Sequence, residues 1–281
     1  MKPLVVLSTI IYDGYELDEM LEHISRATKG CYVEISCVEG ITEHIKPEQF
    51  GDTAFENQLQ KRLKELNLKT ISFGGNMDLT NQEAIPYFVK KMEFCNRMGI
   101  KNIHAFFGPL NKLDDFYRNM EKIDKIAHSL GIVVGVENHE GIMSKEPNIT
   151  AIKKVRTENI GLTYDFVNAY HAAGGNIDLL EDLEEILPYV VHFHLKDTLK
   201  IEDVWEFVEV GTGIMDYLRI FKFLKKNNIT LPLTIELPVR LELNDSPPRK
   251  AKKVRPPMDI NRIDSIMSNS LFYVEQQWEL A

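Results

Sequence analysis

Short runs of apolar and β-branched residues alternate along the chain with longer stretches in which apolar residues recur every three or four positions. Runs of the first kind are typical of strands, and stretches of the second kind are typical of helices that bury one face. The predicted strands cover residues 4–9, 31–37, 68–73, 102–107, 132–137, 160–165, 189–195 and 233–237. This alternation indicates repeated strand–helix units and a parallel sheet.

The segments between these runs have helical periodicity. In the helix predicted between the fourth and fifth strands, apolar residues form one stripe and Gly131 marks the end. The stripe consists of Leu113, Phe116, Tyr117, Met120, Ile123, Ala127 and Leu130. A last helix is predicted over residues 259–278.

Eight strand–helix units in 281 residues predict an α/β fold of the (β/α)8 TIM-barrel type, with residues 1–281 as a single domain. A doubly wound open sheet is the alternative. It is disfavoured because residues 10–14, after the first strand, contain no glycine-rich phosphate loop. Residues 240–257 are rich in proline and basic side chains, and we expect a long loop there.

Composition narrows the class of protein. The formal net charge of −9 argues against a nucleic-acid partner. Three cysteines without close spacing predict reduced thiols. The first residues lack a signal-peptide pattern, and no apolar run approaches the length of a membrane span. We therefore expect a soluble, cytoplasmic protein with no membrane partner; the sequence leaves open whether it forms a homo-oligomer.

The seventh predicted strand has one apolar face and one polar face. Val191, Phe193 and Leu195 alternate with His192, His194 and Lys196. A buried strand does not carry imidazoles without partners. We therefore looked for carboxylates at the ends of neighbouring strands that could share a site with His194.

Four consecutive predicted strands each end with one side chain that can bind a metal. Counting the alternation of each strand turns Glu137, Asp165, His194 and Glu236 toward the barrel axis. In such barrels the active groups lie at the carboxyl ends of the strands. Any one of these residues alone could be a helix cap or one half of an ion pair, but their matched positions predict a common site.

Three carboxylates in one buried space repel each other and are costly to desolvate, and a divalent cation removes both problems. Oxygen donors in the majority favour Mn²⁺, Mg²⁺ or Co²⁺, with Zn²⁺ as a further candidate. We predict one divalent metal ion, with Mn²⁺ as the first choice.

Five motifs in the second half of the chain resemble the xylose isomerase-like barrels. They are VENH at 136–139, GLTYD at 161–165, HFHLKD at 192–197, GTGIMDY at 211–217 and IE at 235–236. That superfamily includes sugar isomerases, ketose 3-epimerases, inosose and dehydroshikimate dehydratases and, more distantly, zinc nucleases of abasic DNA. The resemblance implies that Glu137, Asp165, His194 and Glu236 bind the metal and that Glu137 and Glu236 also serve as catalytic acid and base.

The implied chemistry begins at a carbon beside a ketone. A metal that chelates the ketone and its neighbouring hydroxyl stabilises the enediolate, while two opposed carboxylates remove and return the proton. We predict a metal-dependent isomerase or epimerase acting on a small carbohydrate: a ketose, sugar acid or sugar phosphate. A dehydratase acting on a cyclitol or keto acid is the first alternative. A non-catalytic sugar or metal binder is the second, but it has no need of two opposed glutamates.

Residues around the metal ligands are candidates for substrate binding. They are His139, Asn168, Lys196 and Lys200. Asn168 stands where the family often has a histidine and is a poor ligand for transition metals. The nuclease alternative is disfavoured because residues 73–74 and 107–108, at the ends of the third and fourth strands, are Phe-Gly instead of the required histidines. His192 is expected to support the site from beneath His194.

Basic residues gather in the loop predicted at 240–257. They are Arg240, Arg249, Lys250, Lys252, Lys253 and Arg255. A solvated loop is the favoured interpretation. A lid that attracts a sugar phosphate or sugar acid is the alternative. The segment with Gly211, Gly213 and Asp216 is interpreted as a turn and helix cap.

Overall fold

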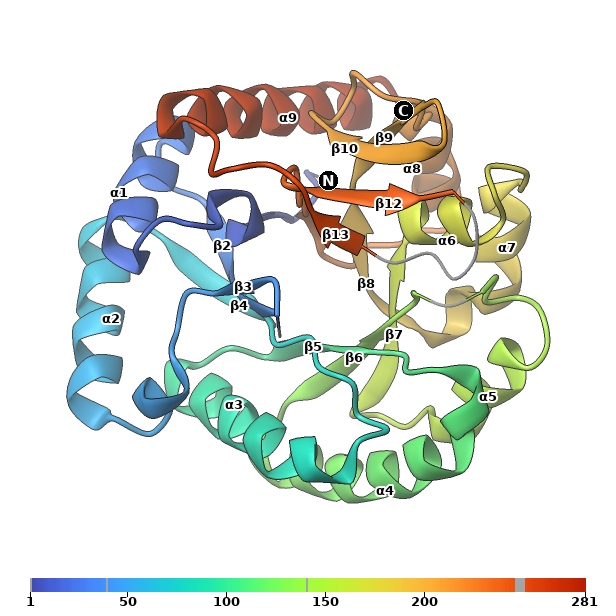
Figure 1. Ribbon diagram of the computed structural model, residues 1–281, viewed down its shortest axis with the longest axis horizontal. Helices are drawn as coiled ribbons and strands as arrows, with labels where there is room; N and C mark the ends of the chain where they lie inside the picture. Colours follow the sequence, from blue (N-terminus) through green and yellow to red (C-terminus); the bar gives the residue numbers. More distant parts are fainter. Residues whose placement is uncertain (1, 39, 140, 246–250) are drawn as a thin grey trace.

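The computed structural model describes residues 2–38, 40–139, 141–245 and 251–281 (Figure 1). Parallel strands form a closed barrel, in which β1 pairs with both β2 and β11. The barrel strands are β1 (Val5–Ser8), β2 (Tyr32–Val38), β4 (Lys69–Gly74), β5 (Asn102–Phe106), β6 (Val133–Glu137), β7 (Ile160–Asp165), β8 (Val190–Leu195) and β11 (Leu233–Ile235). All eight predicted strands are therefore present, and the predicted TIM-barrel fold is confirmed.

Helices surround the barrel (Figure 1). They are α1 (Leu17–Thr28), α2 (Thr53–Glu65), α3 (Ile85–Met98), α4 (Leu113–Leu130), α5 (Asn148–Val155), α6 (Phe166–Ala172), α7 (Leu179–Ile186), α8 (Tyr217–Lys226) and α9 (Ile260–Leu280). The helix α4 ends as predicted at Gly131, whose φ of 62° suits a residue without a side chain. Within the described residues, no helix has both the length and the apolar character needed to cross a membrane.

The core lies between the barrel and the helices. Ile160, Leu162 and Tyr164 of β7 are fully buried and point toward the helices, as their alternation predicts. Cys31, Cys37 and Cys95 are free thiols, in agreement with the sequence interpretation.

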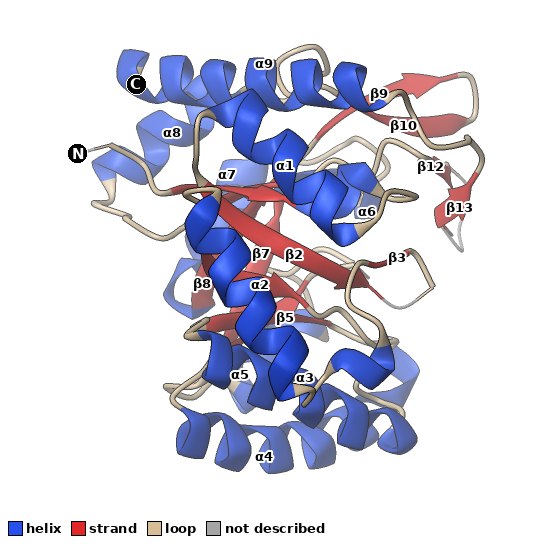
Figure 2. Cartoon of the chain, turned by 90° about the vertical axis from the view of Figure 1, so that its left-hand side faces the viewer, coloured by secondary structure: helices blue, strands red, loops and turns tan. Residues whose placement is uncertain are grey.

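A second, antiparallel sheet corrects the expectation of a long loop at 240–257. It contains β9 (Asp197–Ile201), β10 (Val204–Val208), β12 (Leu241–Asn244) and β13 (Ala251–Lys253). In Figure 2 this sheet lies beyond the end toward which β2 points, which is the carboxyl end of the barrel strands. A further short strand, β3 (Thr42–Glu43), pairs with the end of β2.

The composition of 240–257 did not reveal β12 and β13, and one partner of β12, the strand β10, is remote along the chain. Leu243 of β12 pairs with Trp205 of β10, and Leu241 of β12 pairs with Lys253 of β13. Proline and basic residues dominate the composition of the segment, although two of its short stretches gain strand geometry by pairing. Arg249 and Lys250, two of the basic residues named above, lie outside the described residues.

Candidate metal and active site

The four predicted metal ligands meet at the carboxyl end of the barrel. Glu137 and Asp165 are the last residues of β6 and β7, His194 is the fifth residue of β8, and Glu236 directly follows β11. Asp165 is paired in register with His194, and His194 with Thr234. All four side chains are buried, and one ligand atom from each lies within 4.8 Å of the others. The alternation counted along each strand in the sequence thus agrees with the position of these four side chains inside the barrel.

The Nδ1 atom of His194 lies centrally among the carboxylates. It is 3.1 Å from Glu137 Oε1, 3.2 Å from Glu236 Oε2 and 4.0 Å from Asp165 Oδ2. The carboxylates come from separate strands, so the barrel and not a local loop holds this geometry.

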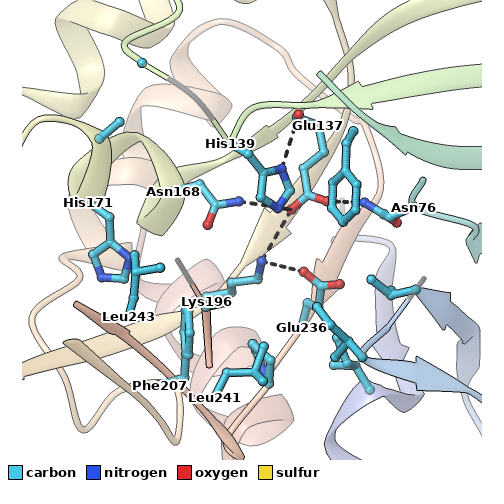
Figure 3. A pocket seen from close by; sticks show the side chains of 18 residues that line it. Asn76, Glu137, His139, Asn168, His171, Lys196, Phe207, Glu236, Leu241 and Leu243 are labelled. Carbon is cyan, nitrogen blue, oxygen red and sulfur yellow. Dashed lines mark hydrogen bonds and ion pairs between the residues drawn. The ribbon is translucent and has the colours of Figure 1, made fainter. Parts of the chain in front are cut away.

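The Lys196 ammonium reaches the same three carboxylates. Its Nζ lies 2.6 Å from Glu236 Oε2 and 3.3 Å from Glu137 Oε1 (Figure 3), and 2.7 Å from Asp165 Oδ2. The sequence suggested that Lys196 binds substrate or orients ligands. Its position gives it a further effect, because it partly neutralises the carboxylates.

Burial and charge act against each other on these groups. Burial alone would raise the pKa of Glu236, but Lys196 and His194 hold that pKa at about 2. The pKa of Glu137 is likewise lowered against the effect of burial, chiefly by Lys196. Burial raises the pKa of Asp165 despite Lys196. The carboxylates of Glu236 and Glu137 raise the pKa of His194 well above its usual value, although burial would lower it.

The donor set fits a divalent cation. It offers carboxylate oxygens from three residues and one imidazole nitrogen, all buried and within reach of one point. Asp165 is arranged for this use because its Oδ1 accepts a hydrogen bond from Asn168 N at the start of α6. Its Oδ2 takes part in an ion pair with Lys196 without a well-aligned hydrogen bond. Asp165 is therefore a helix cap through one oxygen and an available ligand through the other.

A pocket of about 430 Å³ opens above these groups. Glu137, His139, Asn168, Lys196 and Glu236 all line it, so three of the four predicted substrate-binding residues lie beside the predicted ligands (Figure 3). Asn168 Nδ2 donates to Glu137 Oε1 at 3.1 Å. The ring of His139 packs edge-on against Phe106 at 4.5 Å between centroids.

Lys200, the fourth predicted substrate-binding residue, is not brought to this pocket. It lies on the exposed part of β9, with its Nζ 2.7 Å from Asp245 Oδ2, and it is not among the described residues that line the pocket. The sequence placed Lys200 in a loop near the site, whereas the strand pairing of β9 with β10 carries it away.

Three of the described basic residues of 240–255 are engaged in ion pairs. Arg240 and Lys253 both contact Asp13 Oδ2, and Arg255 contacts Glu206 and Glu242. These contacts link the second sheet to the barrel and join its strands to one another. They support neither a freely solvated loop nor a mobile lid for this described part of the segment.

Two residues that the sequence did not single out hold Glu137 and Asp165 in place. Asn76 Nδ2 donates to Glu137 Oε2. Asn138 accepts a hydrogen bond from Asp165 N at 2.7 Å and donates to Asp165 O at 3.0 Å. Asn138 could have been noticed because it follows a predicted ligand directly, whereas Asn76 comes from a loop after β4 and carries no such signal.

Beneath the site lies a polar layer that the sequence revealed only in part. His192 contacts Thr234 Oγ1 through Nε2 at 2.6 Å, in keeping with its expected supporting role. Glu34 of β2 and His104 of β5 are also fully buried and contact each other at 2.9 Å. The alternation of Glu34 with Val33 and Ile35 on a predicted buried strand was the available signal for an inward carboxylate.

Comparisons with known proteins show which family and fold the chain resembles. Over 184 residues, the chain is 26% identical to an inosose dehydratase from Glaesserella parasuis, and the match covers 53% of the chain and 62% of that relative. A xylose isomerase domain protein from Planctomyces limnophilus has a TM-score of 0.72 at 16% identity, with 98% of this chain and 97% of that one covered. A D-allulose 3-epimerase from Methylomonas sp., solved with D-allulose, has a TM-score of 0.68 at 16% identity, with 98% and 97% covered.

The inosose dehydratase match spans less than two thirds of the relative, and the two structural matches establish the fold. The model of one family matches residues 31–255, a range that contains all four predicted metal ligands and the pocket residues that surround them. With the closed barrel and the site at its carboxyl end, this match shows that the chain belongs to the xylose isomerase-like TIM barrel family.

Proposed function

We propose that the protein is a divalent-metal-dependent sugar isomerase or epimerase that uses Glu137 and Glu236 to move a proton on its substrate. The observation that carries this proposal is the placement of these two carboxylates. They come from β6 and from the end of β11, with β7 and β8 between them, and both lie within 3.2 Å of His194 Nδ1 while lining the same pocket.

Glu137, Asp165, His194 and Glu236 would hold the metal. When bound there, a divalent cation supplies Lewis acidity toward a carbonyl and a neighbouring hydroxyl oxygen. Mn²⁺ is our first choice because oxygen donors predominate.

The residues of the chain supply the proton chemistry. Their lowered pKa values keep Glu137 and Glu236 ionised near neutral pH, so that either carboxylate can accept the proton of a carbon beside the carbonyl. For epimerisation, the opposite carboxyl group must first take up a proton from solvent; it then gives this proton to the other face of the same carbon and is left ionised. Proton delivery to the neighbouring carbon interconverts an aldose and a ketose.

The surroundings favour a small uncharged ketose among the proposed substrates. His139, Asn168 and Lys196 provide hydrogen-bonding groups for hydroxyls at the pocket wall. Arg240, Lys253 and Arg255 are held in ion pairs, which lowers the expectation of a phosphate-binding lid from the described part of that segment.

A dehydratase is the second candidate, and the match to inosose dehydratase favours it. Both reactions begin when a carboxylate removes the proton beside a carbonyl. In the dehydratase, the electron pair left on that carbon expels a β-hydroxyl, which leaves as water after protonation. The two candidates therefore share the same residues and differ in the fate of the deprotonated substrate.

The test is proton exchange in heavy water. The Mn²⁺-loaded protein is incubated with a panel of ketoses and cyclitols, and NMR follows deuterium at the carbon beside the carbonyl. We expect exchange with at least one substrate, and the products separate an epimer or isomer from a dehydrated compound. Glu236→Gln should lower the exchange rate by at least about 100-fold, because a positioned base contributes roughly that much.

Glu275→Gln is the matched control, because Glu275 is exposed on α9, away from the pocket, and should exchange at the wild-type rate. Tight metal binding without exchange on any substrate would contradict catalysis and support a metal or sugar binder.

A further inference from the structure

A layer of buried polar side chains lies directly beneath the proposed metal site. Glu34 Oε2 accepts a hydrogen bond from Ser72 Oγ at 2.6 Å and contacts His104 Nε2 at 2.9 Å. His104 Nδ1 in turn lies 2.8 Å from Thr163 Oγ1. Glu34, His104 and His194 have no exposed surface, so each polar atom in this layer needs a partner within the protein.

Two atoms of this layer face each other without a hydrogen bond. Glu34 Oε1 and His194 Nε2 both lack a hydrogen-bond partner, and they lie 4.0 Å apart. One is an acceptor, and the other becomes a donor when it carries the ring proton. The opposite ring nitrogen of His194, Nδ1, points at Glu137 and Glu236.

We propose that Glu34 is a positioning residue for the metal site, which accepts the Nε2 proton of His194 and thereby leaves Nδ1 free as the ligand atom. This inference rests on the proposed metal site. A histidine that binds a metal through one nitrogen must hold its proton on the other, and a carboxylate acceptor there fixes the tautomer, orients the ring and makes it a more basic ligand.

Glu34 suits this role by position. It extends inward from β2, which β1 and β11 separate from β8, so that the barrel itself sets its separation from His194. Its Oε2 already accepts a hydrogen bond from Ser72 and contacts His104, so Oε1 is the oxygen that faces His194. The gap exceeds a normal hydrogen bond by about 1 Å, which a small side-chain shift or one bridging water spans.

A second metal site is the competing interpretation of this layer. One ligand atom from each of Glu34, His104, His192 and His194 lies within 4.8 Å of the others. The contacts favour a hydrogen-bonded support. Both nitrogens of His104 already have partners, as does His192 Nε2. Glu34, His104 and His192 do not line the pocket through which an ion would enter, whereas Glu137 and Glu236 of the proposed metal site do.

The first test compares Mn²⁺ affinity by calorimetry in the wild type, Glu34→Gln and Thr163→Val. Loss of an outer partner of a metal-binding histidine typically weakens affinity by roughly 10–100-fold, and we expect a loss of that size in Glu34→Gln. Thr163→Val is the matched control. It removes a hydrogen bond to His104 in the same layer without touching Glu34 or His194, and its affinity should stay within about twofold of the wild type.

The second test uses the wild-type protein, so it does not depend on whether a variant folds. Long-range ¹H–¹⁵N NMR of the Zn²⁺-loaded protein should show His194 bound through Nδ1 and protonated on Nε2. Ligation through Nε2 would overturn the proposal. Equal Mn²⁺ affinity of Glu34→Gln and the wild type would also overturn it, as would binding of two metal ions per chain.

These outcomes are separable from failure of the metal site itself. If the wild type binds no divalent metal, the proposed function fails and the role of Glu34 falls with it. If the wild type binds one metal and Glu34→Gln binds it equally well, only the positioning role is lost.

Discussion

At the scale of single residues, the site depends on how one buried space accommodates three carboxylates. Each of Glu137, Asp165 and Glu236 is nearly inaccessible to water, so a nearby cation must offset their repulsion. Lys196 provides one such charge, and the proposed metal would provide more. Of the three groups, Asp165 is the one whose ionised form is disfavoured, because burial raises its pKa. The pKa values of the two glutamates are lowered.

Asp165→Asn should therefore abolish metal retention while leaving the fold intact. The amide removes one negative charge and one strong ligand, whereas its oxygen can still cap α6 at Asn168 N. Metal content after gel filtration, measured by mass spectrometry, should fall from about one ion per chain to near zero, a larger effect than the roughly 10–100-fold loss of affinity expected for an outer partner.

The control is Asp178→Asn, which makes the same change at the partly exposed cap of α7 and should retain the metal. Unchanged metal content in Asp165→Asn would rule out this aspartate as a ligand.

At the scale of elements, Asp197 at the start of β9 holds the segment 211–215, which precedes α8, by hydrogen bonds. Its carboxylate accepts backbone hydrogen bonds from Thr198, Gly211, Gly213 and Met215, at 2.9 to 3.1 Å. A Cβ at Gly213 would lie 2.1 Å from Asp197 Oδ1, so only glycine allows this close approach. The predicted turn and helix cap at 211–216 is thus confirmed, with Asp216 capping α8.

Asp197→Ala should lower the free energy of unfolding by about 2–4 kcal/mol, because several buried donors lose their acceptor. Urea denaturation of the metal-free protein measures this loss, and Asp197→Asn should lose less because it retains one acceptor oxygen. For comparison, Asp216→Ala removes a simple exposed cap and should cost about 1 kcal/mol. Equal losses in the two alanine variants would show that Asp197 has no special anchoring role.

At the scale of the whole molecule, the site makes stability depend on pH. The folded metal-free protein holds the pKa of Glu236 at about 2, against an ordinary value of 4.5, and lowers that of Glu137 as well. Below pH 4.5 the unfolded chain therefore binds more protons at these two groups than the folded chain does. Their contribution is complete above that pH and is lost as the pH falls toward 2. The raised pKa of Asp165 acts in the opposite direction and offsets part of this loss.

The metal-free protein should thus lose stability between pH 4.5 and 3, as measured by urea denaturation at several pH values. Lys196→Met should be less stable at pH 6 and show a shallower loss on acidification, because the ammonium that lowers both glutamate pKa values is gone. An equally steep loss in Lys196→Met would show that Lys196 does not control these carboxylates.

The sequence by itself determined the barrel and the four proposed ligands, because both follow from local periods. Alternation along each strand predicts which side chains face inward. The repeat of strand and helix predicts which strand ends lie together at the carboxyl end of the barrel. It was also sufficient to place Asn168 and His139 beside the ligands, since both follow a strand end closely.

Only the tertiary structure decided the contacts between remote segments. Asn76 meets Glu137 across 61 residues, Glu34 meets His104 across 70, and β12 pairs with a strand about 40 residues earlier. No local pattern encodes such pairings, because they depend on burial and hydrogen bonding between segments that only the folded barrel brings together. The position of Lys200 also came only from the structure, because β9 pairs with β10 and Lys200 forms an ion pair with Asp245.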